Sequence, residues 1–182
     1  MMNRLRTMSR SRKIVLGILI TLLVTTGLAV AVGSFRHTHI ITVTRTTTAD
    51  PNVMWHLWED VPNRTDWDHG LDYIKLDDEF REGAAGTVKV DGQDPLDYEI
   101  IDVDPGIGFT DRFYSFAGTY TDWHHTINER PDGRHDVTWR LEASGPLSLI
   151  STPALKSIFG DEVPAAVDEF VELAEKRTAE ED

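Results

Sequence analysis

Two residues of this sequence carry side chains that could move a proton inside a protein. His125 lies in a strand-like run, and Asp111 lies in the run before it. Alternation along a strand places His125 on one face with Thr121, Trp123 and Ile127, and Asp111 on one face with Phe109 and Phe113. Because these faces are apolar, we expect both side chains to point inward. There they could enolise a carbonyl substrate or orient a ligand.

The same residues also have a purely structural interpretation. His125 would then be a hydrogen-bonded interior histidine, and Asp111 would lie at the rim or outside. His124 and His125 point to opposite faces of a strand, so they cannot bind one ion together without a bulge. The sequence has no Gly-rich phosphate loop, nucleophile elbow or His-Glu-x-x-His motif. We therefore expect no metal and no cofactor, and we lean towards a protein that is not an enzyme.

Aromatic residues share the expected interior faces and are predicted to contact a ligand. Tyr98 points inward with Ile100, and Trp139 points inward with Val137 and Leu141. The predicted ligand-binding residues are Trp67, Tyr98, Phe109, Phe113, Trp123, His125 and Trp139. For each of them the alternative is a core side chain with no ligand contact.

Six strand-like runs, each bounded by turn residues, are predicted in the middle of the chain. They cover Leu71–Phe80, Gly86–Val90, Leu96–Val103, Gly108–Phe116, Thr119–Arg130 and His135–Ala143. A β-branched run at His39–Thr48 predicts a strand before them, and Asp50-Pro51 supplies the start of a helix. Consecutive strands joined by tight turns indicate an antiparallel meander.

A long amphipathic helix is predicted at Pro153–Arg177, where apolar residues recur near a period of 3.6. An antiparallel sheet needs its apolar face covered, and this helix is the element large enough to do so. The sequence therefore predicts an α+β fold in which a curved antiparallel sheet wraps around the C-terminal helix.

An uncharged apolar run of 19 residues, Ile14 to Val32, precedes the domain. As a helix it would be about 28 Å long, enough to cross a bilayer once. Five basic residues precede the run, so the positive-inside rule predicts a single-pass protein in the cell membrane with a cytoplasmic N-terminus and an extracytoplasmic domain. The alternative is a signal peptide cleaved near Ala31, which would release a secreted domain.

Charge and cysteine content narrow the function classes. The net charge is −13 for the whole chain and +5 for the first 34 residues, which leaves −18 for the remainder. Such an acidic body repels phosphate backbones, so we expect no nucleic-acid partner. There is no Cys, which excludes disulfides and thiol catalysis. The predicted organisation is a basic N-terminus (1–13), a signal anchor (14–33), a linker (34–37), a domain (38–177) and an acidic tail (178–182).

Several short stretches, taken in order, resemble a known family. They are Ala49–Trp55, Val61–Trp67, the turn at Gly83 and Gly86, and Val137-Thr138-Trp139. Together they resemble the polyketide cyclase/dehydrase and lipid-transport group of the START-like (Bet v 1-like, SRPBCC) superfamily. The resemblance covers about residues 38–177. It implies a helix-grip fold with a cavity between the sheet and the C-terminal helix.

The resemblance implies no single activity, and together with the apolar N-terminal run it leaves three functions open. The first is a membrane-anchored START-like domain that binds a hydrophobic or amphipathic small molecule or lipid. The second is a cyclase or dehydratase acting on a polyketide-like substrate, and the third is a non-catalytic interaction module. They predict, respectively, an open apolar cavity, a cavity with a polar pair at its floor, and an interior filled by the protein's own side chains.

Overall fold

The computed structural model describes residues 10–34 and 36–181, so most of the predicted basic segment 1–13 lies outside the described residues. The first elements are α1 (Arg10–Gly33), β1 (Thr38–Thr47), α2 (Pro51–Glu59) and the 3₁₀ helix η1 (Val61–Asp66). The following strands are β2 (Leu71–Leu76), β3 (Ala85–Val90), β4 (Leu96–Asp104), β5 (Gly108–Tyr114), β6 (Tyr120–Glu129) and β7 (His135–Ser144). A short 3₁₀ helix, η2 (Phe116–Gly118), joins β5 to β6, and α3 (Ser148–Glu181) ends the described chain.

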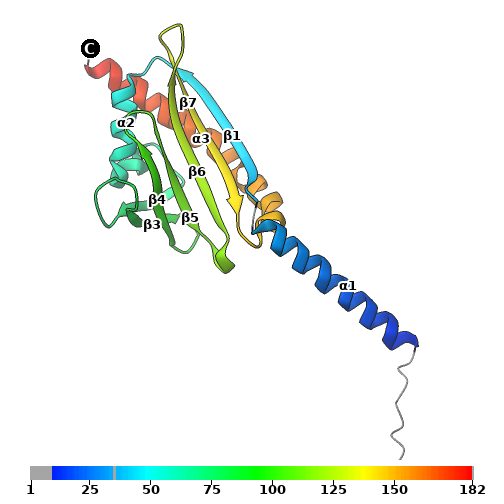
Figure 1. Cartoon of the computed structure of the whole chain (residues 1–182). Helices are drawn as coiled ribbons and strands as arrows, with labels where there is room; N and C mark the ends of the chain where they lie inside the picture. The colour runs from blue at the N-terminus through cyan, green and yellow to red at the C-terminus, as the bar shows by residue number, and fades with distance from the viewer. Residues whose placement is uncertain (1–9, 35, 182) are drawn as a thin grey trace, which may run out of the picture.

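The described strands form one seven-stranded antiparallel sheet in the order β1-β7-β6-β5-β4-β3-β2. Strands β2 to β7 are a meander, and β1 returns to pair with β7, where Val43 lies opposite Trp139. The sheet curves around α3, while α2 and η1 cover the end of the sheet that lies near the C-terminus of the chain (Figure 1). The predicted α+β helix-grip fold is confirmed.

Helix α3 is longer than the sequence predicted. It begins at Ser148 instead of Pro153 and continues through Pro164 to Glu181. The added turn is held by Ser151 N donating to Leu147 O and by Thr152 Oγ1 donating to Ser148 O, so the helix is established before Pro153 removes a donor. The buried stripe of α3 is Val163, Val167, Phe170 and Ala174. This spacing presents one face to the concave side of the sheet.

Helix α2 begins as predicted. The Asp50 carboxylate accepts a hydrogen bond from Asn52 N at 2.7 Å, and Pro51 occupies the first turn. Met54 and Trp58 of this helix are fully buried against the sheet and α3. The chain then turns through the 3₁₀ helix η1 before β2 begins.

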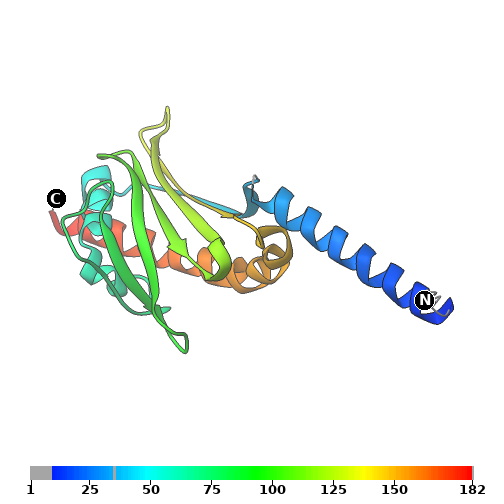
Figure 2. The same ribbon diagram turned by 60° about the horizontal axis from the view of Figure 1, so that its bottom comes forward.

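Helix α1 is long and apolar enough to cross a membrane, and it extends away from the domain (Figure 2). Its end packs on the loop between β7 and α3. A Cβ on Gly33 would lie 2.9 Å from Gly145 O and 3.2 Å from Ser148 Oγ, which is closer than side chains tolerate. Glycine at this position therefore permits the close approach of α1 to the domain.

Candidate functional site

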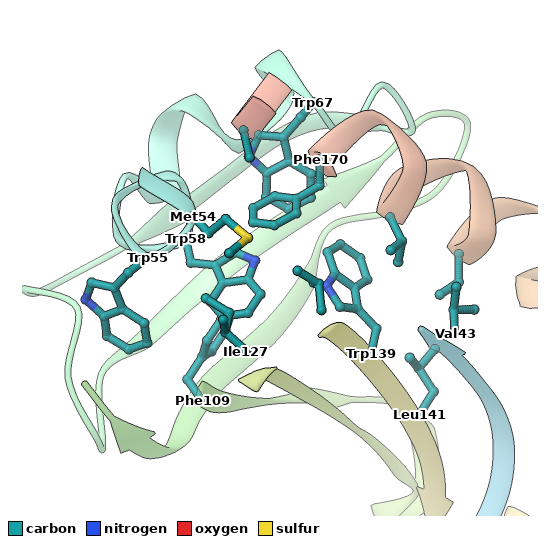
Figure 3. Close-up of a cluster of buried hydrophobic side chains, with 14 of the residues drawn as sticks. Val43, Met54, Trp55, Trp58, Trp67, Phe109, Ile127, Trp139, Leu141 and Phe170 are labelled. Carbon is teal, nitrogen blue, oxygen red and sulfur yellow. The ribbon is translucent and has the colours of Figure 1, made fainter. Parts of the chain in front are cut away.

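The space between the sheet and α3 is occupied by aromatic side chains (Figure 3). Trp58 of α2 lies at the centre, with its ring centroid 5.3 Å from those of both Phe109 and Phe170. Trp67 and Trp139 complete the cluster, 5.6 Å apart. All five side chains are at most 4% exposed. Two open grooves on the protein surface lie along α1, where they are lined by residues such as Ile14 and Leu19.

Arg64 and Asp111 form a buried ion pair next to these aromatic rings. Arg64 of η1 donates from Nη1 to Asp111 Oδ2 at 3.2 Å, and from Nε and Nη2 to Trp58 O at 3.0 and 2.7 Å. Its guanidinium lies 5.0 Å from the centroid of the Phe109 ring. Both charged side chains are at most 4% exposed. The guanidinium therefore links α2, η1 and β5 through charge-assisted hydrogen bonds and a cation–π contact.

Desolvation raises the pKa of Asp111 to about 6, and the nearby Arg64 opposes this rise. Burial also lowers the pKa of His125 well below its usual value, and the positive charge of Arg64 acts in the same direction. His125 Nε2 lies 3.7 Å from Asp111 Oδ2. At neutral pH the pair is therefore a carboxylate beside a neutral imidazole.

His125 is held as a member of the aromatic cluster. Its ring stacks on Phe109, with centroids 4.4 Å apart, and meets Trp139 edge-on at 4.7 Å. The neighbouring His124 points to the opposite face, where it bonds Thr110 Oγ1 at 3.0 Å and lies 3.6 Å from Glu142. The predicted division of the two histidines between the sheet faces is confirmed.

Several buried polar atoms around His125 have no hydrogen-bond partner within the described residues. They are Trp58 Nε1, Trp67 Nε1, Tyr98 Oη, Asp111 Oδ1, both ring nitrogens of His125, and Trp139 Nε1. Buried polar atoms are nearly always paired in proteins, and leaving one unpaired costs about 1–3 kcal/mol. Both ring nitrogens of His125 and the indole nitrogens of the neighbouring Trp58 and Trp139 are among the unpaired atoms, so the surroundings of His125 carry polar groups that an ordinary hydrophobic core lacks.

A second group of aromatic residues leads from this interior to the protein surface. Tyr98 is 1% exposed and stacks on Phe113 at 5.4 Å. Phe113 contacts Trp123 at 5.4 Å, and Trp123 contacts Phe159 of α3 at 5.2 Å. The last three side chains are half-buried. Gly86 makes room for the Tyr98 ring, because a Cβ there would lie 2.7 Å from it.

The structure brings all the predicted site residues to the inner side of the sheet. Trp67, Phe109, His125 and Trp139 join the buried cluster beside Asp111, whereas Tyr98, Phe113 and Trp123 form the line towards the surface. Asp111 is 2% exposed, so it does not lie at the rim. Within the described residues, no group of three His, Cys, Asp or Glu side chains could hold a metal ion.

Sequence reasoning missed Arg64 and Trp58. Arg64 lies in the stretch Val61-Pro62-Asn63-Arg64, which is typical of an exposed turn, and Trp58 lies in the short helix whose start is predicted at Asp50-Pro51. One signal was available for Arg64. A single arginine close to two tryptophans, Trp58 and Trp67, suggests a buried cation, because aromatic faces and carbonyls stabilise a guanidinium.

The profile of the family described as "Polyketide cyclase / dehydrase and lipid transport" matches residues 38–175. This chain belongs to that family. The match begins at β1 and ends within α3, so it includes every strand of the sheet and both members of the Arg64–Asp111 pair. No curated protein sequence gives a significant match.

Solved structures with the same fold include two proteins described as aromatase/cyclases. The Zhui aromatase/cyclase from Streptomyces sp. R1128 has a TM-score of 0.60 and 15% identity, covering 78% of this chain and 96% of that one. The di-domain StfQ from the steffimycin biosynthetic pathway has a TM-score of 0.64 and 9% identity, covering 78% of this chain and 52% of that one. The hypothetical protein jhp0584 from Helicobacter pylori has a TM-score of 0.61 and 11% identity, covering 74% and 88%. At these identities the likeness shows the shared fold.

Proposed function

We propose that this polyketide cyclase/dehydrase-family domain binds one amphipathic small molecule or lipid between its sheet and α3 while α1 anchors it in a membrane. The observation that carries the proposal is the cluster of unpaired hydrogen-bonding atoms around Asp111 and His125. One polar group of a ligand placed there could satisfy several of these atoms at once, which would recover part of their desolvation cost.

The geometry supports a ligand with an apolar body and one polar group. The faces of Trp58, Phe109 and Trp139 suit the apolar part. Tyr98 Oη can donate a hydrogen bond, and neutral His125 offers one donor and one acceptor. Within the described residues the buried rings contact one another instead of lining the open apolar cavity expected for a carrier, so a ligand must displace some of them. Half-buried Phe113 and Trp123 are the rings with room to move.

The membrane part of the proposal is supported by α1 and its charge pattern. The helix is uncharged from Ile14 onward, and five basic residues precede that point, so the proposed topology has a cytoplasmic N-terminus. Large apolar side chains such as Leu23 and Leu28 are 72% and 64% exposed on it. Leaving such a surface in water is unfavourable, and a bilayer would cover it.

The test is to purify the full-length protein in detergent from a membrane-containing host, extract it with organic solvent and identify the released molecules by mass spectrometry. We expect one recurring apolar mass with the wild type and with His124→Phe, the matched control on the outer face. His125→Phe should release about tenfold less, since about 1.4 kcal/mol of binding energy corresponds to tenfold in affinity. Equal release from all three proteins would contradict a ligand site at His125, and release from none would contradict ligand binding and favour an interaction module with a filled interior.

A second candidate function, acid–base catalysis, is favoured by the Asp111–His125 pair. The buried Asp111 carboxylate, whose pKa is raised to about 6, lies 3.7 Å from the neutral His125 imidazole and could accept a proton from carbon next to a carbonyl group. Two of the similar structures are described as aromatase/cyclases, which supports this candidate by analogy of fold. Incubating the extracted ligand with the protein, and with His125→Phe and Asp111→Asn, would separate binding from turnover. Product formation unchanged in both variants would rule out these roles.

A further inference from the structure

The first turns of α3 differ sharply in charge from the rest of that helix. Residues 146–159 contain one charged residue, Lys156, whereas residues 161–181 contain eight acidic and two basic residues. Apolar side chains of this first segment are exposed: Ile150 is 59%, Ile158 is 45% and Leu149 is 37% exposed. An acidic domain thus carries an apolar, acid-free surface at one end of α3. We call residues 146–159 the α3 foot.

The α3 foot lies where α1 joins the domain (Figures 1 and 2). Ser148 Oγ donates to Gly33 O at 3.4 Å, and the backbone of residues 145 and 146 also packs against Gly33. Ile150 follows Ser148 by two residues, and Leu28, the last strongly exposed apolar residue of α1, precedes Gly33 by five. The apolar surfaces of α1 and of the α3 foot are therefore close to each other.

We propose that the α3 foot rests in the headgroup region of the bilayer that α1 crosses. This inference rests on the proposed membrane attachment of α1, which would bring the foot to the bilayer surface. A helical segment with exposed Leu and Ile, no acidic residue and a single Lys suits that position, since its apolar side chains can enter the interface and its cation can face lipid phosphates. The acidic remainder of α3 is repelled by the same headgroups and points the domain away from them.

The position of the α3 foot indicates that the proposed ligand enters from the bilayer. Phe159, within the foot, is the outer end of the aromatic line that passes through Trp123 and Phe113 to buried Tyr98. A molecule leaving the bilayer at the foot would meet this line before any other part of the buried site. The proposed ligand is therefore a bilayer-soluble amphiphile that reaches the interior directly from the membrane and not through water.

The chain has no Cys, which permits single-cysteine labelling. Full-length protein carrying Ile150→Cys, Ile158→Cys, Leu23→Cys or Glu172→Cys would be labelled with a polarity-sensitive fluorophore. Each would be reconstituted in vesicles of equal parts phosphatidylcholine and phosphatidylglycerol. Nitroxide groups placed on the headgroup or in mid-chain then quench fluorophores at the corresponding depth. Glu172, exposed on the acidic part of α3, is the matched control for the foot.

We expect headgroup nitroxides to remove most of the fluorescence at positions 150 and 158 and little at 172, and mid-chain nitroxides to quench position 23. Quenching at position 23 without quenching at positions 150 and 158 would support the anchor but contradict the proposed position of the α3 foot in the headgroup region. Loss of quenching at position 23 as well would contradict the anchor, and with it the membrane part of the proposed function, whereas ligand binding is tested separately by solvent extraction. Equal quenching at 150, 158 and 172 would mean that the domain lies flat on the bilayer, which also contradicts the proposal.

Discussion

Phe109 and His125 stack face to face across β5 and β6, with ring centroids 4.4 Å apart and planes inclined by only 8°. This contact makes the imidazole part of the aromatic interior, 4% exposed, while its two nitrogens have no partner among the described residues. The side chain is therefore packed as a hydrophobic group and carries unused hydrogen-bonding capacity. Its response to protonation should be measurable.

The stability of the protein should depend on pH through His125. Its pKa lies well below the usual value in the folded state, so below about pH 6.5 the unfolded chain binds a proton that the folded chain does not. Stability then falls as pH decreases, by up to about 1.4 kcal/mol per pH unit. Urea titrations at a series of pH values from neutral to mildly acidic should show the wild type losing stability relative to His125→Phe.

The same titrations on Asp111→Asn should show the opposite sign. The pKa of Asp111 is raised to about 6, so between about pH 6 and pH 4 the folded chain binds a proton that the unfolded chain does not. The wild type should gain stability relative to this variant as pH falls through that window. Curves that stay parallel for the wild type and both variants would refute the two assignments.

Removing Arg64 should be strongly destabilising. Arg64→Met leaves the Asp111 carboxylate and Trp58 O without their donor, and breaking a buried ion pair in this way costs about 3–5 kcal/mol. Adding Asp111→Asn should restore part of the loss, because the unpaired charge is gone. Unfolding free energies of the two single variants and the double variant test this coupling. Additive losses would mean that the two side chains do not interact.

Tyr98→Phe should maintain or raise stability. The hydroxyl is buried and unpaired within the described residues, and removing it relieves a desolvation cost of about 1 kcal/mol or more while keeping the stacking on Phe113. Tyr114→Phe is the control, since Tyr114 Oη donates to Glu99 at 2.9 Å on the outer face. Thermal unfolding of both variants checks the expectation. A clear loss of stability in Tyr98→Phe would indicate that its hydroxyl is satisfied in solution.

The mature N-terminus should retain α1. If α1 is an anchor, the intact mass of the membrane-extracted protein includes residues before Ala31, and alkaline washing leaves it in the membrane fraction. A soluble protein whose mass begins just after Ala31 would support the signal-peptide alternative. That result would remove the anchor but leave the ligand-binding proposal standing.

The sequence alone determined the features that depend on local pattern. Charge and hydropathy predicted the apolar helix ending at Gly33, turn residues delimited the strands, and alternation placed His125 and Asp111 on the inner face. These predictions succeed because period and turn chemistry act within a few residues. The meander of strands and the long amphipathic helix together predicted the curved sheet around the C-terminal helix, and the family resemblance implied the same fold.

Tertiary structure alone decided which side chains meet. Arg64 and Asp111 are 47 residues apart, and their pairing depends on η1 folding back under the sheet, which no local pattern specifies. The same is true of Trp58, of the unpaired atoms around His125, and of the α3 foot beside Gly33. Side-chain burial and hydrogen-bond pairing are properties of the packed chain. The free-energy cost of an unpaired polar atom or an exposed apolar one arises only after distant segments have come together.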